Sequence, residues 1–76
     1  MTTVYVDGLP FDWDESKISG FFSNCGVIVR VKAPTWHDSG RLKGYALIEF
    51  KTEAGLEAAL QLDKAKVNVT SYVSVA

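Results

Sequence analysis

The chain has 76 residues with a formal net charge of −1 at pH 7, and 47% of its residues are hydrophobic and 12% aromatic. This length supports one hydrophobic core and hence one domain, and the composition is too apolar for a disordered segment. No apolar run approaches the roughly 20 residues that cross a bilayer, and a single cysteine excludes an internal disulfide, so we expect an intracellular protein of the nucleus or cytoplasm with no membrane association.

The first part of the chain predicts a strand followed by a helix. Residues 3–7 alternate between apolar and other side chains, which is typical of a half-buried strand, and Gly8 follows them. Asp14 is well suited to cap a helix whose apolar side chains recur with helical spacing at positions 18, 21, 22 and 25. Gly26 is placed where such a helix would end.

Two further strands, a second helix and a last strand are predicted after this helix. The β-branched residues at 27–33 predict the second strand, and the polar segment 34–40 predicts an exposed connection. Residues 42–50 alternate as a third strand, Thr52 can cap the second helix, and residues 71–76 predict the last strand. The inner positions of the second helix are Leu56, Ala59 and Leu60.

This order of elements predicts an α+β fold, the ferredoxin-like βαββαβ sandwich. Right-handed crossovers place both helices on one face of a four-stranded antiparallel sheet, with the first and third strands in the centre. The other face of the sheet is then open. Since exposed aromatic side chains gathered in one patch usually mark a binding surface, we expect the functional site on that face.

The predicted open face carries aromatic and charged side chains. Alternation along the strands assigns to it Tyr5, Asp7, Arg30, Lys32, Lys43, Tyr45, Leu47, Glu49, Tyr72 and Ser74. A bulge in the second strand can turn one of its two cations away from this face. Residues 30–51 hold five Lys or Arg against two Asp or Glu, a local charge of +3. A local basic patch of this kind can attract a polyanion even when the whole domain is nearly neutral.

Two segments resemble the signature motifs of the RNA recognition motif (RRM) family. VYVDGL at residues 4–9 resembles its RNP2 motif, and KGYALIEF at residues 43–50 resembles its RNP1 motif. The resemblance implies a module that binds single-stranded RNA. It implies that Tyr5 stacks on a base, that Tyr45 packs against sugars or a neighbouring nucleotide, and that Lys43 pairs with a phosphate.

The resemblance also has implications for the domain organisation and the role of the chain. It implies one RRM domain over residues 1–76, excerpted from a longer protein and monomeric when isolated. Domains of this family serve mRNA processing and translation, so the resemblance implies a role in one of these. It implies no enzyme activity and no cofactor.

Leu47 departs from the family pattern, because an aromatic residue would stack on a second base at this position. A base stacked on an aromatic ring contributes about 1–3 kcal/mol to the free energy of RNA binding, and leucine keeps part of this through apolar contact. We therefore expect a loss of about 1 kcal/mol, or roughly fivefold in affinity. The leucine leaves a second interpretation open, in which the sheet face or the helices bind a polypeptide partner. A third interpretation, a purely structural domain, predicts no binding by this surface.

Several residues outside the sheet have competing interpretations. Trp36, in the connection after the second strand, either closes over a nucleotide with Arg41 nearby or folds back on its own loop. Trp13 is expected to pack at the start of the first helix. His37 has no partner at metal-ligand spacing, and Cys25 is expected at a core position, which argues against a Cys–His catalytic pair. We therefore expect neither a metal site nor catalysis.

Overall fold

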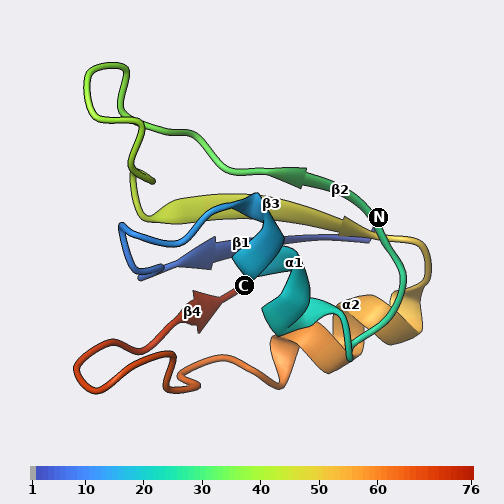
Figure 1. Ribbon diagram of the computed structural model, residues 1–76. Helices are drawn as coiled ribbons and strands as arrows, with labels where there is room; N and C mark the ends of the chain where they lie inside the picture. Colours follow the sequence, from blue (N-terminus) through green and yellow to red (C-terminus); the bar gives the residue numbers. More distant parts are fainter. Residues whose placement is uncertain (1) are drawn as a thin grey trace.

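The computed structural model describes residues 2–76 and shows a four-stranded sheet with two helices (Figure 1). In chain order the elements are β1 Thr3–Asp7, α1 Glu15–Phe22, β2 Ile28–Lys32, β3 Tyr45–Phe50, α2 Glu53–Leu60 and β4 Ser74–Val75. The strands lie in the order β2-β3-β1-β4, and each neighbouring pair is antiparallel. This arrangement confirms the predicted ferredoxin-like fold and its two central strands.

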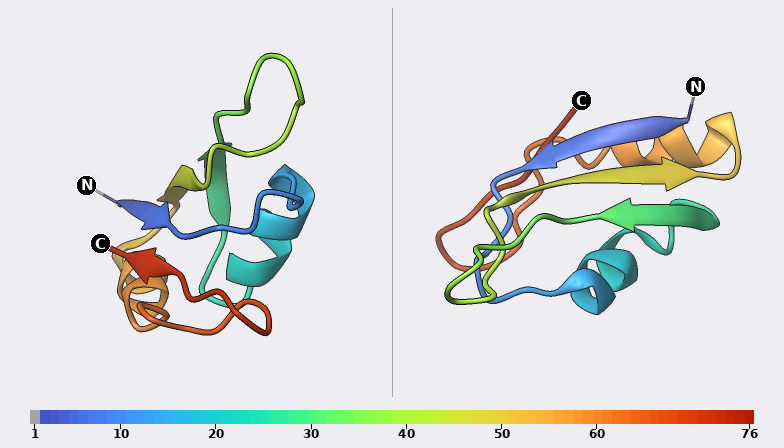
Figure 2. Two further views of the ribbon diagram at one scale, coloured as in Figure 1. Left: turned by 90° about the vertical axis from the view of Figure 1, so that its left-hand side faces the viewer. Right: turned by 90° about the horizontal axis from the view of Figure 1, so that it is seen from above.

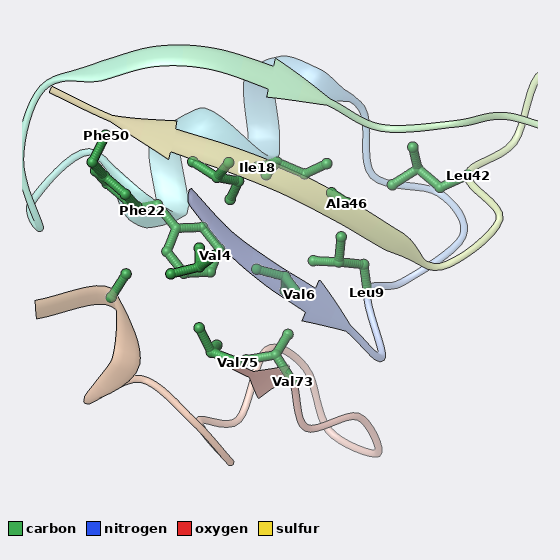
Figure 3. Close-up of a cluster of buried hydrophobic side chains, with 12 residues drawn as sticks. Val4, Val6, Leu9, Ile18, Phe22, Leu42, Ala46, Phe50, Val73 and Val75 are labelled. Carbon is green, nitrogen blue, oxygen red and sulfur yellow. The ribbon is translucent and has the colours of Figure 1, made fainter. Parts of the chain in front are cut away.

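One face of the sheet is buried beneath both helices. Alternate side chains of β1 and β3 meet Ile18 and Phe22 of α1 and Ala59 of α2 in one hydrophobic core (Figure 3). The buried residues of this core are Val4, Val6, Leu9, Ile18, Phe22, Leu42, Ala46, Ile48, Phe50, Ala59, Val73 and Val75. Because side chains alternate along a strand, the remaining ones point to the opposite face, which no helix among residues 2–76 covers.

Each helix begins after the cap residue that the sequence predicts. The side chain of Asp14 accepts a hydrogen bond from the backbone N–H of Lys17 at 2.9 Å, and that of Thr52 accepts one from Gly55 at 3.2 Å. These bonds satisfy amide groups that have no partner within the first helical turn. Neither of these short helices, nor any other stretch of residues 2–76, forms a helix long and apolar enough to cross a membrane.

Helix α1 ends earlier than the sequence predicts. Its last residue is Phe22 and Ser23 is its C-cap, so Gly26 does not terminate it. Gly26 has a packing role instead, because a Cβ built on it would lie 3.0 Å from the Cα atom of Gly55 in α2. A Cβ on Gly55 would in turn lie 3.0 Å from the ring of Phe50. The two glycines therefore allow α2 to approach both the end of β3 and the segment before β2.

Strands β3 and β4 are shorter than the sequence predicts. Gly44 has φ +105°, outside the extended region, so regular pairing starts at Tyr45 rather than at residue 42. Near the C-terminus only Ser74–Val75 form β4. The backbone just before β4 is engaged elsewhere, since Tyr72 forms an isolated bridge with Lys66 in the preceding connection.

Strand β2 contains an irregularity that determines which of its side chains reach the open face. Its pairing with β3 shifts register between Ile28 and Arg30, which leaves Val29 as an exposed bulge. Beyond the bulge, Arg30 and Lys32 are opposite open-face residues of β3. The bulge therefore turns neither cation away, and both share the face that carries the tyrosines.

Gly8→Ala is predicted to destabilise the fold by about 1–3 kcal/mol. Gly8 has φ +81°, and a Cβ there would lie 2.5 Å from the carbonyl oxygen of Tyr72, a backbone atom held next to β4. Urea unfolding followed by circular dichroism measures the change.

Gly20→Ala is the matched control for this substitution. Gly20 lies on the exposed side of α1, and no heavy atom outside its own helix backbone and chain neighbours lies within 4 Å of a Cβ built on it. Because alanine has a higher helix propensity than glycine, the free energy of unfolding of this variant should rise by about 0.5–1 kcal/mol. Equal unfolding midpoints for the two variants would contradict the proposed role of Gly8.

Candidate nucleic-acid interface

The centre of the open face is a pair of tyrosine rings from the two central strands. Tyr5 of β1 is opposite Leu47 of β3, and Asp7 is opposite Tyr45, so the two tyrosines are diagonal neighbours. Their ring centroids lie 5.9 Å apart with 28° between the planes, within the range of offset stacking. Tyr5 is 42% exposed. The pair therefore presents an aromatic surface that a planar ligand can contact.

Leu47 borders a shallow depression beside this pair. The depression has a volume of about 210 Å³ and is lined by Thr3, Arg30, Lys32, Leu47 and Glu49. Leu47 itself is 39% exposed. Thr3 was missed by the sequence interpretation, although it alternates in phase with Tyr5 and the signal was therefore present. The depression combines an apolar side chain with charged groups of both signs.

The charged groups of this depression are only loosely paired with each other. Nη1 of Arg30 lies 3.9 Å from Oε1 of Glu49, which is longer than a hydrogen bond. The side chain of Arg30 is 74% exposed and that of Glu49 is 38% exposed. An exposed ion pair of this kind contributes about 0–1 kcal/mol. Both groups can therefore be redirected to a ligand at little cost.

The connection between β2 and β3 projects from the sheet and carries Trp36 (Figure 2). Backbone hydrogen bonds from Trp36 to Arg41 and from Gly40 to Trp36, both 2.8 Å, close this loop. Nζ of Lys43 lies 5.0 Å from the centroid of the Trp36 ring, which is a cation–π distance. Trp36 itself is 52% exposed. Trp36 thus contacts the lysine that begins the RNP1-like segment, and part of its surface stays open to solvent.

The other two predicted site residues lie outside the central group. Tyr72 is exposed just before β4. Arg41 and Lys43 line a second depression of about 730 Å³. This depression also includes the exposed ring of Phe11, which the sequence interpretation missed because it lies outside both motifs. The sequence did contain a signal for this residue, because Phe11 is an aromatic residue in the polar segment directly after Pro10.

The cysteine and the histidine lie on either side of β2, Cys25 before the strand and His37 in the loop after it. Cys25 is half-buried beyond the end of α1, which corrects its predicted position in a buried helical stripe. Burial raises the pKa of the Cys25 thiol and so lowers its thiolate fraction at neutral pH. No group of three His, Cys, Asp or Glu side chains within residues 2–76 could hold a metal ion. Trp13, expected to pack at the start of the first helix, instead contacts Phe21 near the end of α1, with ring centroids 5.6 Å apart.

An antiparallel βαββαβ sheet with aromatic and basic side chains on the face away from its helices defines a class of nucleic-acid-binding modules. The family model described as RNA recognition motif matches residues 4–71 of this chain. The chain therefore belongs to the RNA recognition motif family.

Two curated relatives and one solved structure illustrate this membership. Phragmoplastin interacting protein 1 of Arabidopsis thaliana is 39% identical over 62 residues, which are 82% of this chain and 10% of that protein. Nucleolar protein 13 of Saccharomyces cerevisiae is 40% identical over 58 residues, 76% of this chain and 14% of that protein. The structure of the Rna15 RRM with bound RNA (GU) is 27% identical with a TM-score of 0.89, and the match covers 97% of this chain and 79% of that chain. This chain thus spans a small part of the curated relatives.

The contact between Lys43 and Trp36 is predicted to stabilise the protein by about 0.5–1 kcal/mol. A double-mutant cycle with Lys43→Met and Trp36→Leu, measured by urea unfolding at low salt, should give a coupling free energy in this range. The matched control combines Lys51→Met with Trp36→Leu, because Lys51 is an exposed lysine at the other end of β3. Its coupling should be zero, and equal couplings for the two lysines would contradict the contact.

Proposed function

We propose that this domain binds single-stranded RNA across the open face of its sheet, with bases stacked on tyrosine rings. The observation that carries the proposal is the pair Tyr5 and Tyr45, whose rings lie 5.9 Å apart with 28° between their planes. Unpaired RNA bases expose π-faces, which such a pair can accept. Family membership and the RNA bound to the similar Rna15 domain support this function.

The cations around the tyrosines match the phosphates of an RNA strand. Lys43 lies just before β3, and Arg30 and Lys32 lie along the edge strand β2. We assign Lys32 and Lys43 to phosphate contacts, and Arg30 to the depression beside Leu47 where a base would lie. Tyr5 then stacks on one base, and Tyr45 packs against the adjoining sugar or nucleotide.

The remaining site residues extend this surface. Leu47 offers apolar contact to a second base in place of a full stack, and we assign the exposed residues Trp36, Arg41 and Tyr72 to contacts with a longer strand. A module with these contacts should bind short RNA with a free energy on the order of −6 to −8 kcal/mol, which corresponds to micromolar dissociation constants.

We further propose that the domain is a binding module rather than an enzyme, within a longer protein of the nucleus or cytoplasm. In the two curated relatives the matched region is 10% and 14% of the whole protein, and one of them is named as nucleolar. A role in mRNA processing or translation is consistent with a domain that holds single-stranded RNA.

A polypeptide partner is the second candidate, because apolar side chains are exposed away from the tyrosine pair. Val29 lies at the bulge of β2 and Val27 lies just before the strand, and both line a groove together with Glu15 and Ser19 of α1. One relative is named as a phragmoplastin-interacting protein. Salt distinguishes the two candidates, because RNA binding weakens steeply as salt rises, whereas an apolar protein contact does not.

Tyr5→Ala is predicted to weaken RNA binding by about 1–3 kcal/mol through the loss of one base stack. Fluorescence anisotropy of labelled single-stranded oligomers measures the affinity, and amide chemical shifts show whether the contacts fall on the open face. Val69→Ala is a control, since Val69 is also exposed but lies in the connection before β4. Unchanged affinity in Tyr5→Ala would argue against stacking on this ring.

Leu47→Phe is predicted to tighten RNA binding by roughly fivefold, because a ring restores the second stack. If the same face binds a polypeptide adapted to leucine, the larger ring should weaken that contact instead. Isothermal titration with RNA oligomers measures the change. An affinity equal to that of the unmodified protein would show that no base lies on Leu47.

A further inference from the structure

We propose that the depression beside Leu47 selects a guanine base, and that Glu49 is the residue that determines this selection. The inference rests on the proposed binding of RNA to the same face. Leu47 supplies apolar contact, and Arg30 and Glu49 supply a donor and an acceptor at its rim. These groups come from two paired strands, since Arg30 on β2 is directly opposite Glu49 on β3.

The carboxylate of Glu49 is available to a ligand. Oε1 of Glu49 lies 3.9 Å from Nη1 of Arg30, which is beyond hydrogen-bond distance. The carboxylate can therefore still accept hydrogen bonds from a ligand. Asp7, the other carboxylate in phase with the open face, is less available, because its Oδ1 already accepts the N–H of Gly8 at 2.8 Å. Glu49 is therefore the better acceptor for a base edge.

Guanine has the base edge that matches this pair most fully. Its N1–H and N2–H groups are adjacent donors that can engage both oxygens of one carboxylate, and its O6 lies next to them as an acceptor for a guanidinium. Adenine and cytosine offer an amino group beside a ring acceptor, so a carboxylate gains one bond and faces one repulsion. Uracil offers one N–H between two carbonyl oxygens, which repel a carboxylate on both sides.

Leu47 makes this edge contact more important than it would be beneath an aromatic ring. A stacked ring holds any base, because every base has a π-face, and so it contributes affinity with little selectivity. Leucine gives a smaller and less oriented contact. The position of the base therefore depends more on the hydrogen bonds at its edge, where the charges of Arg30 and Glu49 lie.

The test compares labelled heptamers of sequence UUUXUUU, in which X is guanosine, inosine, adenosine, cytidine or uridine. Fluorescence anisotropy at constant salt should show that guanosine binds about tenfold more tightly than adenosine, cytidine or uridine, as expected for one bidentate contact. Inosine keeps N1–H and O6 but lacks the amino group at N2, so its affinity should be intermediate.

Glu49→Gln identifies the residue responsible. An amide has one acceptor oxygen, so this variant should lose most of the tenfold preference for guanosine over adenosine. The ratio of the two affinities is the readout, because removal of a negative charge should strengthen binding of all oligomers alike. Glu57→Gln is the matched control, since Glu57 is an exposed carboxylate on α2 and its variant should keep the preference.

The outcomes separate this inference from the proposed function. Equal affinities for all heptamers, or a guanosine preference that survives in Glu49→Gln, would overturn the inference and leave RNA binding intact. A preference for cytidine or adenosine would overturn the assignment to guanine. Failure of every heptamer to bind would overturn the inference together with the proposed function.

Discussion

The burial of only one face of the sheet is the constraint on which the rest of the structure depends. A chain of 76 residues supports a single core, so the helices α1 and α2 both contribute to the side of the sheet that holds Val4, Ala46 and Ile48. Alternation along β1 and β3 then points Tyr5, Tyr45 and Leu47 outward. The proposed binding surface is therefore the reverse side of the core rather than a separate element.

The charge of this surface is a matter of local arrangement, because the chain as a whole carries −1. Arg30 and Lys32 follow the bulge at Val29 and both lie on the face of the tyrosines, and Trp36 in the loop after β2 contacts Lys43. Together these cations border the tyrosine pair on the β2 side of the sheet and at one end of β3. A nearly neutral domain can in this way attract a polyanion to one surface and repel it elsewhere.

Leu47 shifts the balance between affinity and selectivity on this face. An aromatic ring at its position would add stacking energy that is nearly independent of the base. With leucine, the site relies more on the donor and acceptor groups of Arg30 and Glu49, which distinguish one base edge from another. In the proposed binding mode, modest affinity and guanine selection both follow from the same side chain.

The sequence by itself determined the features that depend on residues close together in the chain. The alternation of 3–7, the caps Asp14 and Thr52, and the two RNP-like segments were sufficient to predict the fold and the central tyrosines. Only the tertiary structure decided the features that join distant segments. These are the bulge in β2, the approach of Gly26 to Gly55, the contact of Lys43 with Trp36, and the register that brings Thr3 and Arg30 opposite Glu49. The physical reason is that caps and alternation act within a few residues, whereas register and close packing are set by side chains that meet only when the core assembles.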